Sequence, residues 1–130
     1  MGGARMIALD THFWIWFHLG DPRLTDNVTS RIGRDTVVST ATIWEATLLL
    51  EKGRIVSEYS PQTTVQRWLD AAPMRIVPID REIVFLSRSL SFLHEDPADR
   101  FIAATAFSCN LPLATLDGRL RSLTWLKTIC

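Results

Sequence analysis

Short apolar stretches that alternate with helix-like stretches restrict the fold of this sequence more than any other feature. We expect strands at residues 6–9, 36–39, 75–79 and 111–116, with a last short strand within residues 123–129. We expect helices at residues 11–19, 25–33, 41–52, 61–72, 81–92 and 97–109. Because strands and helices alternate, the sequence favours the α/β class, with a mainly parallel central sheet and helices on both faces.

Length and composition favour one domain of ordinary globular type. The chain has 130 residues, of which 47% are hydrophobic, so it can bury a sizeable core. We expect a single domain at residues 6–130 and a disordered extension at residues 1–5. No apolar run is long enough to cross a membrane, and the acidic Asp10 follows the start too closely for a signal peptide. Two cysteines are too few for a disulfide framework, which indicates a reducing cytoplasm.

The charge balance argues against strong non-specific binding to nucleic acid. Fourteen basic and fourteen acidic side chains give a formal net charge of zero, whereas nucleic-acid-binding proteins usually carry excess positive charge. A chain of this kind that acts on nucleic acid needs local basic residues and bound cations. Lys52, Arg54, Arg119 and Arg121 are candidate phosphate contacts, although isolated pairs of this kind more often belong to ordinary solvated surface.

Two carboxylates open the helix predicted at residues 97–109. Asp96 suits the N-cap and Pro97 the first helical position, so capping explains Asp96 well. Asp99 shares a helix face with the apolar Ile102 and with Ala103. An ionised carboxylate among apolar side chains needs a partner or a cation. We therefore favour metal binding over capping for Asp99.

Further acids stand where predicted strands end or helices begin. Asp10 and Asp117 follow apolar stretches, and ligands of parallel α/β sheets bind outside the carboxyl ends of the strands. Glu45 lies one turn into its helix beside an apolar stripe. Carboxylates gathered without basic partners repel one another unless a cation lies among them, and oxygen ligands select Mg²⁺ or Mn²⁺.

Other site chemistries are not indicated. The sequence has no phosphate-binding glycine loop, dinucleotide fingerprint or serine nucleophile elbow. The spacing of His12, His18 and His94 does not favour zinc. We interpret His12 as an aromatic packing residue and His94 as a solvated loop residue. The aromatic side chains of residues 11–19 fit a core helix with a partner or dimer face better than base stacking.

Four segments of the chain resemble the PIN-domain family, most closely VapC-type ribonuclease toxins of bacterial toxin–antitoxin pairs. The segments read MIALDTH at residues 6–12, VSTATIWE at 38–45, DPADRFIAATA at 96–106 and LATLD at 113–117. The resemblance covers the chain from Met6 onward and implies a PIN-like three-layer α/β/α domain.

The resemblance also implies a site and an activity. Its catalytic and metal-binding residues are Asp10, Glu45, Asp99 and Asp117, with Thr11, Asp96 and Thr115 in auxiliary positions. The implied function is Mg²⁺-dependent hydrolysis of tRNA or ribosomal RNA, with Mn²⁺ as an alternative ion, leaving 5′-phosphate and 3′-hydroxyl ends. The implied partners are RNA, a VapB-like antitoxin and a second copy of the chain in a homodimer.

Two alternatives stay open. A magnesium-dependent phosphatase of the haloacid-dehalogenase type would also place an aspartate at a strand end. That class expects a second acid two residues after Asp10, where His12 stands. A PIN-like binding module that has lost catalysis is the other alternative, although all four acids are present.

Overall fold

The computed structural model describes residues 6–130, and the extension predicted at residues 1–5 lies outside the described residues. Within this range the strands are β1 (Ala8–Leu9), β2 (Val37–Ser39), β3 (Arg75–Val77), β4 (Leu113–Ala114) and β5 (Thr128–Ile129). They form one sheet in the order β3-β2-β1-β4-β5, and every neighbouring pair is parallel. The predicted α/β class with a parallel central sheet is confirmed.

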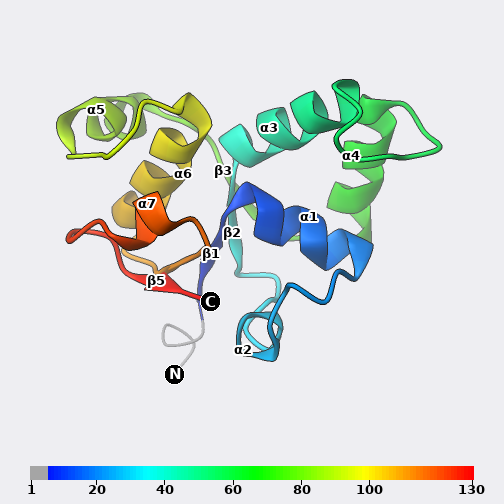
Figure 1. The fold of residues 1–130 in the computed structure, drawn as a ribbon, viewed down its shortest axis with the longest axis horizontal. Helices are drawn as coiled ribbons and strands as arrows, with labels where there is room; N and C mark the ends of the chain where they lie inside the picture. The colour runs from blue at the N-terminus through cyan, green and yellow to red at the C-terminus, as the bar shows by residue number, and fades with distance from the viewer. Residues whose placement is uncertain (1–5) are drawn as a thin grey trace.

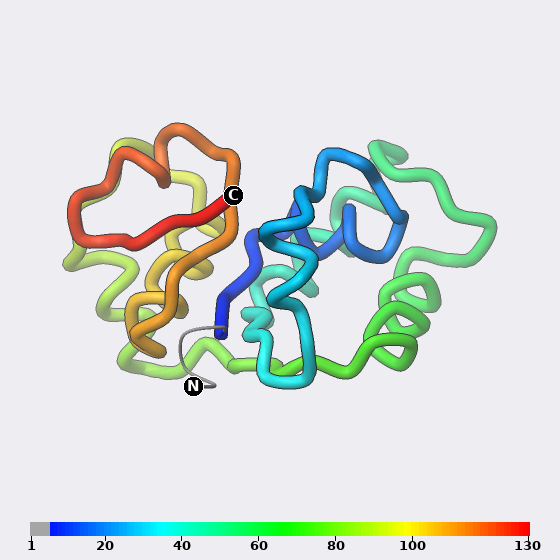
Figure 2. Tube along the Cα trace, turned by 90° about the horizontal axis from the view of Figure 1, so that it is seen from below, coloured from blue at the N-terminus to red at the C-terminus, as the bar shows by residue number. Residues whose placement is uncertain are grey.

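Helices lie on both sides of this sheet. They are α1 (Thr11–Leu19), α2 (Asp26–Thr29), α3 (Thr40–Glu51), α4 (Pro61–Ala71), α5 (Arg81–Ser89), α6 (Pro97–Ser108) and α7 (Gly118–Arg121). Figure 1 shows α1 to α4 on one side and α5 to α7 on the other, and Figure 2 separates the same two groups from below. Among the described residues, no helix combines the length and hydropathy that crossing a membrane requires.

The two faces of the sheet have separate cores. Leu9 and Val38 pack with the buried Trp14 of α1. The next residue along β1, Ala8, packs on the opposite side with Ile102 of α6. This alternation is what a strand with helices on both faces requires. The aromatic residues of α1 thus contribute mainly to the core, as predicted.

The strand positions explain where a site can form. β1 lies between β2 and β4, with Ala8 opposite both Val37 and Leu113. The carboxyl ends of these three parallel strands therefore meet at one edge of the sheet. The side chains that follow β1, β2 and β4 are brought together there, although they are far apart in sequence.

Several predicted boundaries were wrong in detail. β4 ends at Ala114, so two residues separate it from Asp117. The helix α7 was not predicted, and α5 ends at Ser89, about three residues early. Asp117 begins α7 by accepting a hydrogen bond from the backbone N–H of Arg119 at 2.8 Å. A cap of this kind removes Asp117 from the strand and makes it the first residue of a turn.

Candidate active site

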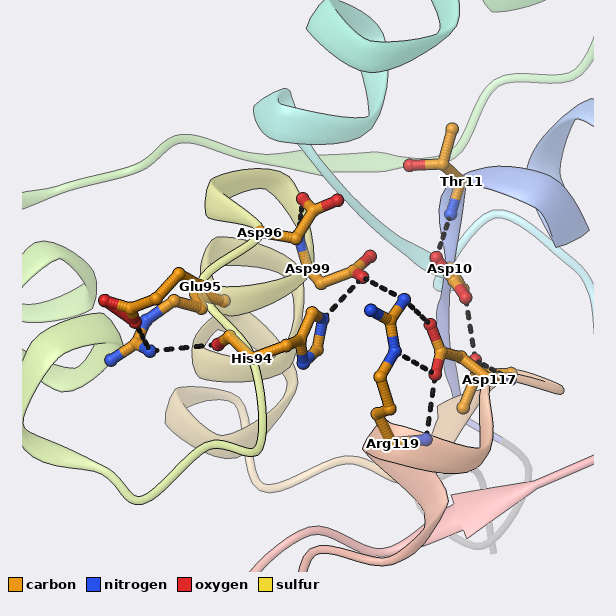
Figure 3. A network of polar contacts seen from close by, with 10 residues as sticks. Asp10, Thr11, His94, Glu95, Asp96, Asp99, Asp117 and Arg119 are labelled. Carbon is orange, nitrogen blue, oxygen red and sulfur yellow. Dashed lines mark hydrogen bonds and ion pairs between the residues drawn. The ribbon is translucent and has the colours of Figure 1, made fainter.

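Asp10 is the most enclosed acid at the carboxyl edge of the sheet. It follows β1 directly and is only 6% exposed. Its Oδ1 accepts a hydrogen bond from the backbone N–H of Thr11 at 2.6 Å, which caps α1, and its Oδ2 accepts one from the hydroxyl of Thr115 at 2.7 Å. Both carboxylate oxygens are thus fixed by neighbouring groups (Figure 3).

Thr115 connects the two acids that follow neighbouring strands. Besides donating to Asp10, its hydroxyl oxygen accepts a hydrogen bond from the backbone N–H of Asp117 at 3.0 Å. Thr11 acts differently: its backbone N–H binds Asp10, while its hydroxyl donates to Thr42 on α3 at 3.3 Å. The predicted auxiliary threonines thus both contact Asp10, one by its side chain and one by its backbone.

The start of α6 contributes the next two acids. Asp96 caps the helix, because its Oδ1 accepts a hydrogen bond from the backbone N–H of Asp99 at 3.3 Å. Asp99 lies in the first turn and is buried. Glu45, on α3, is half-buried. One carboxylate oxygen from each of Glu45, Asp96 and Asp99 lies within 4.8 Å of the others.

All the predicted acids line one pocket. Its volume is about 280 Å³, and its lining includes Asp10, Glu45, Asp96, Asp99 and Asp117. Asp10 follows β1, and Asp117 caps α7 shortly after β4. Asp96 and Asp99 lie at the start of α6, and Glu45 lies one turn into α3. The structure therefore brings together side chains separated by up to about a hundred residues, which is the geometry that the sequence analysis expected.

Burial and mutual repulsion act on these carboxylates in the same direction. Burial, with a smaller contribution from the nearby Asp99, raises the pKa of Asp10 to about 6, against the opposing hydrogen bond from Thr115. Burial also raises the pKa of Glu45 and of Asp99, and neighbouring acids add to both shifts. The cluster therefore resists being fully ionised in the absence of a cation.

Arg119 holds the remaining acid in its charged form. Its guanidinium donates to both oxygens of Asp117, at 3.3 and 3.0 Å, and lies 3.8 Å from Oδ2 of Asp99. Burial would raise the pKa of Asp117, but the hydrogen bonds of Arg119 outweigh it and lower that pKa. In the described part of the chain, Arg119 is the one arginine or lysine that lines this pocket. The sequence analysis offered Arg119 as a candidate phosphate contact or as solvated surface and did not predict its contacts with Asp117 and Asp99.

His94 is the residue that sequence reasoning missed. The prediction of a solvated loop residue was wrong: its side chain is 10% exposed, and its Nε2 lies 2.8 Å from Oδ2 of Asp99. Figure 3 shows the ring directed at that carboxylate. No periodic pattern reports such a contact, because the loop before α6 folds back onto the helix it precedes. Only the closeness of His94 to the DPAD motif was available as a signal.

The other two histidines lie differently. His12 was interpreted as a packing residue, but it is exposed and lines the mouth of the pocket, 6.1 Å from the ring of Trp16. His18 stacks on Trp68 at 5.4 Å outside the pocket, and burial lowers its pKa to about 4. Among the described residues, His94 is the one histidine with a ring nitrogen within hydrogen-bonding distance of a pocket carboxylate.

The donor set fits a hard divalent cation. The pocket offers carboxylate oxygens from five acids and one arginine to balance them, and Mg²⁺ and Mn²⁺ prefer such ligands. Two groups bring their ligand atoms within 4.8 Å of one another, namely Glu45 with Asp96 and Asp99, and His94 with Asp99 and Asp117. Asp99 belongs to both groups and is the centre of the cluster.

Comparison with known proteins adds three observations. The family model described as PIN domain matches residues 7–126 of the chain. No curated protein sequence matches this chain. Solved structures share the fold at low sequence identity.

Three of these structures illustrate the likeness. A toxin–antitoxin complex from Klebsiella pneumoniae has a TM-score of 0.68 at 17% identity, covering 95% of this chain and 96% of that chain. VapBC2 from Rickettsia felis, bound to a promoter DNA fragment, has a TM-score of 0.70 at 16% identity, covering 95% and 97%. FitAcB from Neisseria gonorrhoeae has a TM-score of 0.69 at 23% identity, covering 96% and 97%.

Proposed function

The chain belongs to the PIN domain family, and on that premise we propose that it is a metal-dependent endoribonuclease toxin neutralised by a cognate antitoxin. PIN domains are generally nucleases, and the solved structures compared above include toxin–antitoxin complexes. Membership of this family argues against a phosphatase of the haloacid-dehalogenase type.

The observation that carries the proposal is the single pocket lined by five carboxylates. Three of them, Asp10, Glu45 and Asp99, have raised pKa values because burial disfavours their charged forms. A protein keeps such a costly arrangement where a cation or a developing charge uses it. A module that only binds a partner has no need for it.

Each acid has a distinct role in the proposed reaction. Asp10, Asp99 and Asp117 hold the metal directly or through water. Glu45 either ligates the metal or holds the attacking water. Thr115 fixes the orientation of Asp10 through its 2.7 Å hydrogen bond. A divalent cation held by these acids would supply Lewis-acid polarisation of the phosphodiester and would favour deprotonation of the attacking water. The products carry 5′-phosphate and 3′-hydroxyl ends, with no covalent enzyme intermediate.

RNA is favoured over DNA as the substrate by the likeness of the four motifs to VapC-type toxins. The zero net charge implies weak non-specific binding. Selectivity should therefore come from RNA shape and from a few unpaired bases near the pocket, as in a tRNA or a ribosomal RNA loop.

The test is a cleavage assay with mapped ends. Purified protein is incubated with total RNA, with and without Mg²⁺ or Mn²⁺, and new 5′ ends are sequenced. We expect discrete cuts that require the metal and disappear in Asp10→Asn. Asp35→Asn, which changes an exposed aspartate outside the pocket, should cut like the wild type.

Three outcomes would contradict this function. Absence of cleavage with metal present would contradict the nuclease activity. Equal cleavage by Asp10→Asn would contradict the assignment of the active site. Cleavage of single-stranded DNA in preference to RNA would support a metal-dependent nuclease but contradict RNA as its substrate.

A growth experiment tests the same function in cells. Expression without antitoxin should arrest bacterial growth, and Asp10→Asn should relieve the arrest while the protein stays folded.

The surface beside α1 supports an antitoxin partner. A hollow of about 770 Å³ is lined by apolar residues including Leu19, Val56 and Tyr59, and these three side chains are exposed. Leu19 and Val56 also line a second hollow, which shares His12 and Trp16 with the acidic pocket. We propose that an apolar antitoxin segment follows these hollows and places a basic residue among the acids.

A binding measurement tests this partner. A candidate VapB-like antitoxin is co-expressed with this chain, and the complex is isolated by size exclusion. Val56→Asp should weaken the complex, because it places a charge in the apolar hollow. Asp35→Asn should leave the complex intact. A complex that forms equally well with Val56→Asp would contradict the proposed route.

A further inference from the structure

We propose that His94 is a positioning residue for the acidic site: its Nε2–H donates to Oδ2 of Asp99 and fixes the carboxylate so that the other oxygen is free for a cation. The inference rests on the proposed function only in taking Asp99 as a metal ligand. Figure 3 shows that the second oxygen of Asp99 lies away from both His94 and Arg119. Asp99 also offers a ligand atom within 4.8 Å of those of Glu45 and Asp96.

The loop that carries His94 is fastened to α6 by the buried Arg100. The Nε of Arg100 donates to the backbone carbonyl of Ser87 at 2.8 Å, and its Nη1 donates to the carbonyl of His94 at 3.1 Å. The same Nη1 pairs with the carboxylate of Glu95, and the guanidinium lies over the ring of Phe92 at 4.4 Å. The backbone at His94 is thus held from the same helix that carries Asp99, so the imidazole has a defined position.

The surroundings of the imidazole select one tautomer. Nδ1 of His94 is buried and has no hydrogen-bond partner in the described part of the chain. A hydrogen on Nδ1 would leave a buried donor unsatisfied and would turn the lone pair of Nε2 toward the carboxylate. A hydrogen on Nε2 instead gives a charge-assisted hydrogen bond to Asp99. The contact with Asp99 therefore favours the tautomer that carries its hydrogen on Nε2.

The same observation distinguishes positioning from direct metal ligation. A histidine that binds a metal nearly always donates its other N–H to an acceptor, which fixes the ring. Nδ1 of His94 has no acceptor among the described residues. His94 thus lacks the second contact that a metal ligand needs, while its Nε2 already has a carboxylate partner at 2.8 Å.

The experiment compares three variants by titration with Mn²⁺ alone in a calorimeter. His94→Leu removes the donor and should weaken Mn²⁺ binding by about 10- to 100-fold, the usual cost of losing such a partner. His94→Gln keeps an N–H donor at similar reach and should stay within a few-fold of the wild type. Asp35→Asn is the control, since it changes an exposed aspartate outside the pocket, and it should bind Mn²⁺ unchanged.

Each contrary result has a distinct meaning. Unchanged binding in His94→Leu would overturn the proposal. Equal losses in His94→Leu and His94→Gln would show that the imidazole itself is needed, as in a direct ligand, and would also overturn it. Metal-free thermal unfolding of each variant checks that it folds.

A spectroscopic measurement on the wild type keeps the proposal testable if His94→Leu does not fold. The nitrogen chemical shifts of His94 should report the Nε2–H tautomer in the metal-free protein, and this tautomer should persist when Mg²⁺ is added. Loss of the hydrogen from Nε2 on adding Mg²⁺ would mean direct ligation and would overturn the inference.

One further variant separates this inference from the proposed function. If Asp99→Asn binds Mn²⁺ as tightly as the wild type, Asp99 is no ligand and the metal site of the proposed function is wrong. If Asp99→Asn loses binding and His94→Leu does not, the site stands and only the role of His94 is wrong.

Discussion

At the scale of single residues, the site is a set of carboxylates whose charges oppose their burial. Asp10 shows this most clearly. Its two hydrogen bonds favour the ionised form, yet burial outweighs them and raises its pKa from 3.8 to about 6. At neutral pH, the buried charge of Asp10 therefore destabilises the metal-free protein, and a bound cation would relieve this destabilisation.

We predict that Asp10→Asn stabilises the metal-free protein at pH 7. The unfolded chain releases the Asp10 proton near pH 3.8 and the folded protein near pH 6. Between these values the folded state binds more protons, so a rise in pH through this window lowers stability by about 3 kcal/mol. Asp10→Asn avoids this loss of stability, although the weaker hydrogen bond between Asn and Thr115 offsets part of the gain. Urea unfolding at pH 4 and pH 7 measures the difference.

The control for this prediction is Asp35→Asn, which alters an exposed aspartate. It should unfold like the wild type at both pH values. If the difference between wild type and Asp10→Asn is the same at pH 4 and pH 7, Asp10 does not titrate as argued here.

We predict that Arg119→Ala strengthens metal binding severalfold. Arg119 is 55% exposed and places its guanidinium 3.0 Å from Asp117 and 3.8 Å from Asp99. It therefore competes with a cation for these carboxylates. Arg121→Ala removes an exposed arginine from the same helix and should leave the affinity unchanged. Mn²⁺ titration of both variants tests this, and equal affinities would show that Arg119 does not compete.

The residues that could be predicted from sequence are those whose place follows from an element. Asp10 follows a strand and Asp99 lies in the first turn of a helix, so the pattern of apolar and polar residues alone indicates their positions. His94 and Arg119 reach the same carboxylates from a loop and from a four-residue helix. Their contacts depend on how those segments fold back, and a local pattern carries no information about that.

At the scale of elements, the start of α6 combines two tasks in one turn. Asp96 caps the helix through the backbone N–H of Asp99, which places Asp99 in the first turn beside the pocket. Pro97 at the first helical position and the buried Ala98 complete the turn. The capping role of Asp96 could be predicted because Asp96 and Pro97 act on the helix end itself, while metal binding by Asp99 stays a prediction.

We predict that Asp96→Ala and Asp96→Ser separate capping from metal binding. Asp96→Ala should lower the free energy of unfolding by about 1 kcal/mol, the usual cost of losing a cap, and Asp96→Ser should restore most of it. Because we expect Asp96 mainly to cap, Asp96→Ser should weaken Mn²⁺ binding less than Asp99→Asn does. Thermal unfolding and Mn²⁺ titration measure the two effects. Equal weakening in both variants would make Asp96 a direct ligand.

Element boundaries were harder to predict than element types. The sequence indicated a strand running to Leu116, but β4 ends at Ala114 because the chain turns into the cap of α7. At four residues, α7 is too short for a periodic apolar pattern. The strand β3, by contrast, lies at the edge of the sheet and ends directly before Pro78, which agrees with the confinement of proline to strand ends and edges.

At the scale of the whole molecule, the order of the strands decides what the chain can do. β1 is central and pairs with β2 on one side and β4 on the other. That residues 6–130 form one domain remains a prediction, and this pairing of the first strand with strands from both halves supports it. The functional prediction depended more on the resemblance to the PIN-domain family than on the composition of the chain.

We predict that the isolated protein forms a homodimer. Large apolar side chains are exposed on its surface, among them Trp44 at 59% and Phe85 at 65%. Such groups are often covered by a partner. Sedimentation at micromolar concentration should show a dimer, and Phe85→Glu should shift it toward monomer if α5 lies in the interface. A wild type that sediments only as monomer would contradict the dimer.

The central position of β1 also bears on the order in which the acidic pocket can assemble as the chain folds. Asp10 lies far ahead of Asp99 and Asp117 in the sequence. Their strand β4 must pair with β1 before the acids can meet. A nascent chain that has been synthesised only as far as α6 therefore lacks the assembled pocket, because β4 and Asp117 have not yet been made.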